Sequence, residues 1–153
     1  MNRAASIVLG CVRALVGASF AVHGSAILFG TPAISGVTTK FAEWPGWWAG
    51  LIELVGGAAV AIGLATRAAA LLCSGSMAYA FLTVHLPHGV LPINNGGEPA
   101  AMFCWAFFLI AVLGPGAFAI DNALRGRSFV GRRKDARRRA GADTVDRARL
   151  STG

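Results

Sequence analysis

The sequence predicts an all-α integral membrane protein in which a bundle of four helices crosses the bilayer. Hydrophobic residues make up 55% of the 153 residues and charged residues only 14%, and the mean hydropathy is +0.59. A soluble domain carries about 25% charged residues. Four apolar segments are long enough to span the bilayer, at about 20 residues for one crossing, and three of them show almost none of the polar stripe of a helix in a soluble bundle. These helices are expected at residues 4–29, 47–65, 68–86 and 99–118.

The first segment, residues 4–29, has features of both a signal peptide and a retained helix. Arg3 precedes the apolar run, as in a signal peptide, but the run exceeds the usual length of about 7 to 15 residues and is interrupted by Arg13 and His23. It is therefore interpreted as a retained helix. Arg13 shares a helix face with Gly17, and small residues mark the faces on which membrane helices pack, so this face is expected to point into the bundle.

The remaining helices follow from their apolar runs and the turns between them. A cluster of tryptophans begins the second helix, where indole rings suit the headgroup level. A tight turn containing Arg67 links the second and third helices, and the turn-rich segment 87–98 precedes the fourth. Glu98 in the first turn of that helix would stabilise the helix dipole, so capping explains this residue as well as chemistry does.

Charge predicts the orientation of the chain. Residues 1–121 hold four basic and four acidic residues, whereas the tail from Asn122 onward holds ten Lys or Arg and three Asp. By the positive-inside rule the tail lies in the cytoplasm and, with four crossings, so does the N-terminus; Arg3 and Arg67 fall on the same side. The sequence thus predicts a membrane domain at 1–121 in the plasma membrane. A basic cytoplasmic tail at 122–153 would be disordered or lie on anionic lipids.

Three chemically capable residues share one depth in the predicted bundle. His23, Glu53 and Cys104 each lie five or six residues from the outer end of their helix, which places them roughly 7 to 9 Å below the outer boundary. His85 ends the third helix just above them. Such ionisable residues inside a membrane are costly and are usually functional.

Several motifs keep their order and spacing across the four predicted helices. They are Arg13 to Gly24, Trp48 to Gly57, His85, Asn95 to Glu98, Cys104, Gly114 to Gly116, and Asp121. Together they resemble the DoxX family of small four-helix membrane proteins, over residues 10–121. One position departs from the family: a lysine often stands four residues after the first-helix histidine, and this chain has Ile27 there. No role of that lysine carries over.

The resemblance implies a redox setting. DoxX-like proteins are tied to quinone-linked oxidation of sulfur compounds, and others to thiol and superoxide defence beside soluble enzymes such as sulfurtransferases and superoxide dismutase. The leading hypothesis is a membrane redox component, as a subunit of a quinone-linked oxidoreductase. It would bind a quinone or a similar lipid-soluble carrier between its helices near the outer face. A quinone headgroup requires hydrogen-bond donors and groups that relay protons.

The candidate site residues have distinct expected roles. Catalytic candidates are His23, which would donate to a quinone oxygen or exchange a proton with it, Glu53, which would relay protons to the outer side, and His85 at the exit. The candidate binding residues are Arg13, Asn95, Glu98 and Cys104. Arg13 also lies close enough to the inner boundary for a structural role, with its charged end reaching the headgroups. Cys104 would either line the site or meet a sulfur substrate.

Other interpretations of these residues stay open. His23 and Glu53 could pair across two helices only to fix their register. With His85 they have the composition of a two-histidine, one-carboxylate metal site, but three different helices supply them, so neither a metal nor a haem is expected. No two of the three cysteines form a CxxC pair, which favours packing roles. No nucleotide-binding glycine fingerprint or P-loop occurs.

The basic tail supports a different class of function. A non-catalytic scaffold would recruit soluble redox enzymes, such as a sulfurtransferase or superoxide dismutase, through this tail. Lipid headgroups alone explain such a tail, so nucleic acid is not expected as a partner. A small proton or solute transporter is less favoured, because one chain of four helices without an inverted repeat would need a homo-oligomer.

Overall fold

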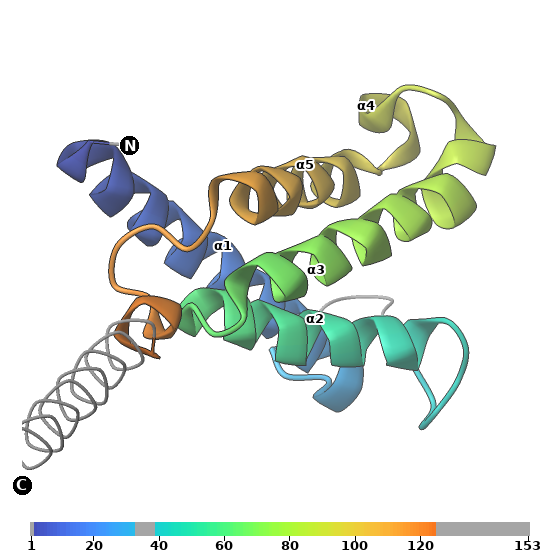
Figure 1. Ribbon diagram of the computed structural model, residues 1–153. Coiled ribbons are helices and arrows are strands. Elements are labelled where there is room, and N and C mark those ends of the chain that lie inside the picture. The colour runs from blue at the N-terminus through green and yellow to red at the C-terminus, as the bar shows by residue number, and fades with distance from the viewer. Residues whose placement is uncertain (1, 33–38, 125–153) are drawn as a thin grey trace, which may run out of the picture. The chain divides into compact units, whose positions relative to one another are not determined.

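The computed structural model describes residues 2–32 and 39–124, and the chain divides into two compact units, residues 1–121 and 122–153. The helices named below belong to the first unit. Secondary structure within the described residues is entirely helical, with no strand (Figure 1). This confirms the all-α class. The predicted state of the basic tail, from residue 125 onward, concerns residues outside those described.

The first helix, α1 (Arg3–Phe29), has 27 residues and definite signals at both ends. The side chain of Asn2 accepts a hydrogen bond from the amide of Ala5 at 2.8 Å, which satisfies one of the amides that a helix start leaves unpaired. Gly30 ends the helix at φ +66°, a conformation that costs glycine little. The helix is long and apolar enough to cross a membrane.

The turn between the next two helices, α2 (Gly46–Ile62) and α3 (Thr66–Ala80), begins earlier in the chain than the sequence predicts. The second helix is expected to reach residue 65, but it ends at Ile62. Gly63 and Ala65 both adopt positive φ, +75° and +46°, and such residues cannot continue a right-handed helix.

The start of α3 is capped from far along the chain. The carboxylate of Asp121 accepts hydrogen bonds from the amides of Ala65 and Thr66, both at 2.8 Å, and from the hydroxyl of Thr66 at 2.7 Å. Ala65 itself offers no capping side chain. Asp121 therefore replaces a local N-cap and fixes the end of the folded unit against the turn between α2 and α3.

Beyond α3 the helical path continues through a π-helical turn, η1 (Phe81–His85), and a short 3-10 turn, η2 (Leu86–His88). The continuous segment Thr66–His88 is the second one in the described chain that is long and apolar enough to cross a membrane. One further turn of helix, α4 (Pro92–Asn95), lies within the segment that the sequence predicts to be rich in turns.

The last apolar helix, α5 (Glu98–Leu113), ends before the predicted boundary at residue 118. Gly114 and Gly116 adopt φ of +94° and +64°, and Pro115 between them has no amide hydrogen to continue the helix. With 16 and 17 residues, α5 and α2 are apolar but shorter than the two long segments.

The helices pack in two intimate pairs, α1 with α2 and α3 with α5, and α2 also contacts α3. Glycine allows the first pair to approach closely: a Cβ placed on Gly17 would lie 2.5 Å from the amide nitrogen of Ala61, and one on Gly57 would lie 2.6 Å from that of Ala21. By contrast, α1 meets α5 over a small area, where Phe20 packs against aromatic rings of α5.

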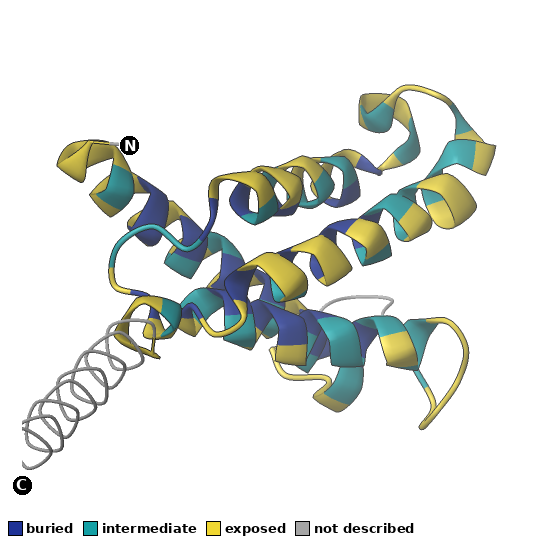
Figure 2. Cartoon of the chain, in the orientation of Figure 1, coloured by how far each residue is buried: buried dark blue, intermediate teal, exposed yellow. Residues whose placement is uncertain are grey.

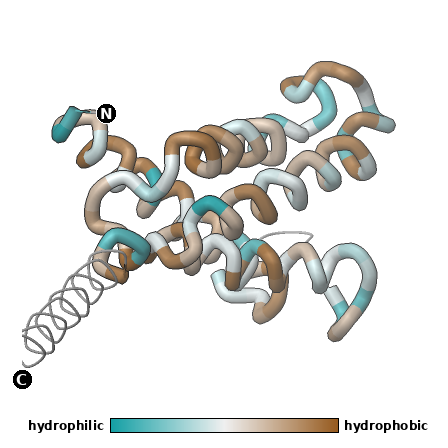
Figure 3. The backbone as a smooth tube through the Cα atoms, in the orientation of Figure 1, coloured by the Kyte–Doolittle hydropathy of each residue, from teal (hydrophilic) through white to brown (hydrophobic). Residues whose placement is uncertain are grey.

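The outward surface is apolar and the interior holds two charges. Large hydrophobic side chains are exposed along all four long helices, where exposed residues (Figure 2) alternate with the buried ones and hydrophobic residues recur along each helix (Figure 3). Arg13 and Glu53 are the charged residues buried within the described chain. An exposed apolar surface of this extent is typical of contact with lipid rather than water.

Candidate functional site

The buried carboxylate of Glu53 pairs with His23 across the interface between α1 and α2. Glu53 Oε2 lies 2.6 Å from His23 Nδ1. The contact depends on the neighbouring small residues, because a Cβ on Gly24 would lie 2.6 Å from the carbonyl oxygen of Gly50 and 2.8 Å from the Cβ of Glu53. The backbones therefore meet at the level of the pair, and the two functional side chains are brought into direct contact.

The two partners differ sharply in exposure. The side chain of Glu53 is 3% exposed, whereas that of His23 is 47% exposed. A buried carboxylate requires a hydrogen-bond donor, and His23 Nδ1–H is the donor that the geometry offers when Glu53 is ionised. His23 Nε2 lies on the opposite edge of the ring from this bond. The site therefore offers one buried proton-binding group and one imidazole that an external molecule can reach.

Aromatic rings pack together in the interface between α1 and α5, one helical turn from the pair. Phe20 lies one turn before His23 and is 1% exposed. Its ring centroid lies 5.1 Å from that of Phe103 and 4.7 Å from that of Phe107. An apolar layer therefore lies one helical turn from the pair, on the side of the α1 N-terminus.

Cys104, predicted to share the layer of the pair, makes its polar contacts with α3 instead. The hydroxyl of Ser74 donates to the carbonyl oxygen of Cys104 at 2.9 Å and lies 3.7 Å from its sulfur. Cys73, next to Ser74, is fully buried, and a Cβ on Gly56 would lie 2.5 Å from its sulfur. Cys73 thus packs against α2 one helical turn from Glu53.

His85 belongs to a second polar cluster. Its Nδ1 lies 3.1 Å from the carbonyl oxygen of Asn95, and its ring stacks on Phe81. The Asn95 side chain donates to the carbonyl oxygen of Gly89 at 2.6 Å and accepts from the amide of Gly97 at 2.8 Å. This cluster braces the connection between η2 and α5. No hydrogen bond links it to the His23–Glu53 pair within the described residues.

Glu98 lies exposed in the first turn of α5, where its charge favours the helix dipole. It makes no hydrogen bond or ion pair with any part of the chain that the structure describes. Across residues 2–32 and 39–124, no group of three or more His, Cys, Asp or Glu lies close enough together to hold a metal ion. The composition of a two-histidine, one-carboxylate site is therefore not matched by geometry there.

Arg13 is 1% exposed, and its guanidinium is engaged by backbone oxygens. Nε donates to Pro115 at 2.9 Å, Nη1 donates to Val60 and Ala61, and Nη2 donates to Phe118 at 3.3 Å. Carbonyls at the end of α2 are thereby joined to the segment after α5. This arrangement supports the structural interpretation of Arg13 and leaves little of its donor capacity for a ligand.

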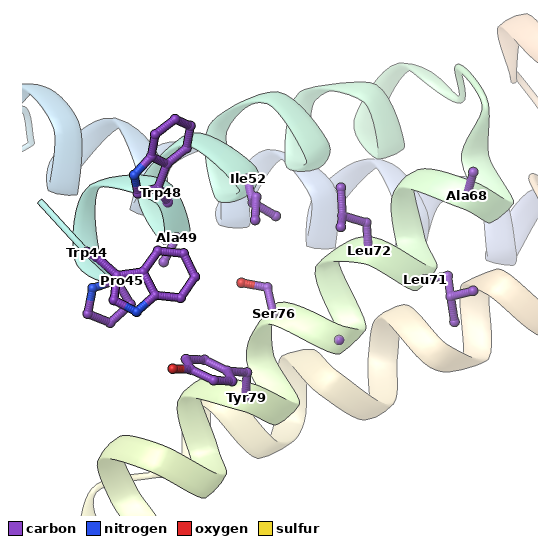
Figure 4. A pocket seen from close by; sticks show the side chains of 11 residues that line it. Trp44, Pro45, Trp48, Ala49, Ile52, Ala68, Leu71, Leu72, Ser76 and Tyr79 are labelled. Atoms are coloured by element: carbon purple, nitrogen blue, oxygen red, sulfur yellow. The ribbon is translucent and has the colours of Figure 1, made fainter. Parts of the chain in front are cut away.

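An apolar groove between α2 and α3 is a feature that motif reasoning did not locate. Its cavity volume is about 550 Å³, and one end is lined by Trp44, Trp48 and Tyr79, with the hydroxyl of Ser76 directed into it (Figure 4). The tryptophan cluster was the available sequence signal. Neither His23 nor Glu53 lines this groove, so the polar pair and the groove are separate features.

The helical fold, its two long apolar segments and its exposed apolar surface are features of the membrane class of proteins. Residues 8–86 match the DoxX family, and the chain belongs to this membrane family, as the sequence motifs predict. An uncharacterised protein of Haemophilus influenzae is 35% identical over 118 residues, which cover 74% of this chain and 88% of that protein. No solved structure matches the chain. The family match includes His23, Glu53 and His85.

Proposed function

We propose that this DoxX protein is a membrane redox component that binds a quinone or similar lipid-soluble carrier at the His23–Glu53 pair. The observation that carries the proposal is the contrast within the pair: a buried carboxylate holds an imidazole that is half exposed on an apolar surface. An uncovered imidazole facing lipid is unfavourable, and a carrier carbonyl oxygen would satisfy it by accepting from Nε2–H, which is present when the imidazole is protonated or when Glu53 holds the proton.

The proposed topology places this pair near the outer face. All four long helices cross, with α2 and α5 spanning a locally thinned bilayer. Arg3, Arg67 and the basic tail then lie on the cytoplasmic side. The His23–Glu53 pair lies in the outer half, within roughly 9 Å of the boundary.

A quinone supplies two-electron, two-proton chemistry when bound. The chain supports that chemistry by proton handling: His23 Nε2 faces the carrier oxygen, and Nδ1 transfers its proton to or from Glu53 Oε2 across the 2.6 Å contact. Glu53 stores the proton and exchanges it with the outer aqueous side. The electrons come from a thiol or other sulfur donor, and two thiols form one disulfide for each carrier reduced. The pair therefore transfers protons and carries no electrons.

The test is a titration of the full-length protein in nanodiscs with a soluble short-chain quinone, for wild type, His23→Ala and Glu53→Gln. His88→Ala is the matched control, because among the described residues the His88 side chain bonds only to the nearby carbonyl oxygen of Val84. We expect saturable binding that weakens at least about tenfold in both site variants, since a hydrogen bond to a charged group is worth about 1.5–3 kcal/mol. Equal binding in wild type and His23→Ala would refute the proposed site.

The composition of the tail favours a second candidate, a scaffold that recruits acidic soluble redox enzymes. Ten basic residues beyond Asn122 provide the attraction. Deleting residues 125–153 separates the two functions. The redox proposal predicts that carrier binding persists in the truncated protein, whereas the scaffold proposal predicts loss of the bound enzyme while the helices remain folded.

A further inference from the structure

A second groove, between α3 and α5, ends at an exposed cation. It has a cavity volume of about 550 Å³ and is lined by Arg67 at one end and by apolar side chains of both helices, including Leu71, Phe108 and Val112. The guanidinium of Arg67 lies over the end of α5, since a Cβ on Gly114 would be 3.1 Å from Nη2. Arg67 makes no hydrogen bond or ion pair among the residues the structure describes.

A carboxylate binds the start of α3, just before Arg67. Asp121 accepts three hydrogen bonds from Ala65 and Thr66 at the start of α3, immediately before Arg67. Its charge therefore serves the helix end. Arg67 stands as a cation at the boundary of the segment Thr66–His88, which is long and apolar enough to cross a membrane.

This groove and the tryptophan-lined groove between α2 and α3 lie on either side of one ridge. Ala68 and Leu71 line both of them. From this ridge the α2–α3 groove runs along α3 to Tyr79, a distance of about 16 Å at 1.5 Å per residue. That is about half of the roughly 30 Å hydrocarbon core, which is the depth of one leaflet.

We propose that the two grooves and Arg67 form a binding site for one anionic diacyl phospholipid that straddles the first half of α3. The phosphate pairs with the Arg67 guanidinium, which matches phosphate geometry. One acyl chain lies in the α3–α5 groove and the other in the α2–α3 groove. The site shares no residue with the His23–Glu53 pair, so its test is independent of the proposed redox function.

The chain offers a clean variant for the acyl groove. Gly75 lines the α2–α3 groove, and a Cβ on it would meet no atom within 4 Å, so Gly75→Leu places an apolar side chain in the groove with no clash at its Cβ. Its matched control is Ala18→Leu, on an exposed face of α1. Arg67→Gln removes the phosphate partner, and its control is Arg3→Gln, a second exposed arginine at the end of an apolar helix.

The experiment is native mass spectrometry of the purified full-length protein, delipidated and then titrated with phosphatidylglycerol or phosphatidylcholine. Salt at about 0.5 M suppresses headgroup binding by the basic tail. We expect one phosphatidylglycerol per chain to be retained. Arg67→Gln should weaken its binding about fivefold, the effect of roughly 1 kcal/mol for one basic residue. Gly75→Leu should weaken both lipids, and the control variants neither.

Four results would overturn the site. Equal affinity for the two lipids would show that charge is not recognised, and equal losses in Arg67→Gln and Arg3→Gln would assign binding to general electrostatics. Undiminished binding in Gly75→Leu would remove the acyl chain from the groove. Competition by free glycerol phosphate at the concentration of the lipid would identify a phosphate site rather than a lipid site.

Discussion

Arg13 illustrates how a single residue can serve the fold at a position where the sequence also suggested a ligand contact. The helix face that it shares with Gly17 predicts that it points inward from α1, and its side chain is buried. The sequence could not predict its partners, because they are backbone oxygens of a helix end and of the segment after α5, which only the folded chain assembles. A sequence motif identifies side chains but does not show which backbone carbonyl oxygens lie near them in the folded chain.

We expect Arg13→Gln to destabilise the protein by about 3 kcal/mol, because several buried carbonyl oxygens would lose their donor. Arg13→Lys should fall between wild type and Arg13→Gln, since one ammonium group cannot reach all the acceptors. The measurement is the free energy of unfolding in mixed micelles, with exposed Arg3→Gln as the control. A loss in Arg13→Gln no greater than in Arg3→Gln would contradict the structural role.

The candidate site was predictable in part. Helix rise alone predicts that His23 and Glu53 share a depth, and the structure joins them. The same reasoning grouped Cys104 with them, but depth does not determine rotation about the helix axis, and Cys104 bonds to Ser74 of α3. His85 and Asn95 are near in sequence and do meet, in a separate cluster.

At the scale of the element, the ends of the helices follow from backbone conformation rather than from hydropathy. Apolar composition continues past Ile62 and Leu113, so hydropathy extended both helices too far. The positive φ values of Gly63 and Gly114 end them earlier. The all-α class, set by the apolar runs themselves, was predicted correctly.

Substitution by alanine is predicted to have opposite effects at Gly17 in α1 and at Gly75 in α3. Gly17→Ala should destabilise by about 1–3 kcal/mol, because the added Cβ would lie 2.5 Å from the amide of Ala61 and force α1 from α2. Gly75→Ala should be neutral or stabilise by up to about 1 kcal/mol, because its Cβ would meet open space and alanine favours helix. Thermal unfolding of both variants beside wild type provides the comparison. Equal effects would contradict the close packing of α1 on α2.

At the scale of the whole molecule, charge asymmetry predicts the topology in the membrane. In a variant with Cys11, Cys73 and Cys104 replaced, Val90→Cys between η2 and α4 should react with a membrane-impermeant maleimide in intact cells. Leu64→Cys, in the turn between α2 and α3, should react only after lysis, because Arg67 and the basic tail place that turn inside. Labelling of Leu64→Cys in intact cells would reverse the proposed orientation.

The central claim is that His23 and Glu53 act as one site for a lipid-soluble carrier rather than as a pair that only fixes helix register. The most direct test is a double-mutant cycle on quinone affinity, with His23→Ala, Glu53→Gln and the double variant measured in nanodiscs beside their melting temperatures. The account predicts that each single variant loses most of the binding, that the double variant loses little more, and that melting temperatures change by only a few degrees. Unchanged quinone affinity in all three variants, together with a large coupled loss of thermal stability, would contradict it and leave the pair a packing device.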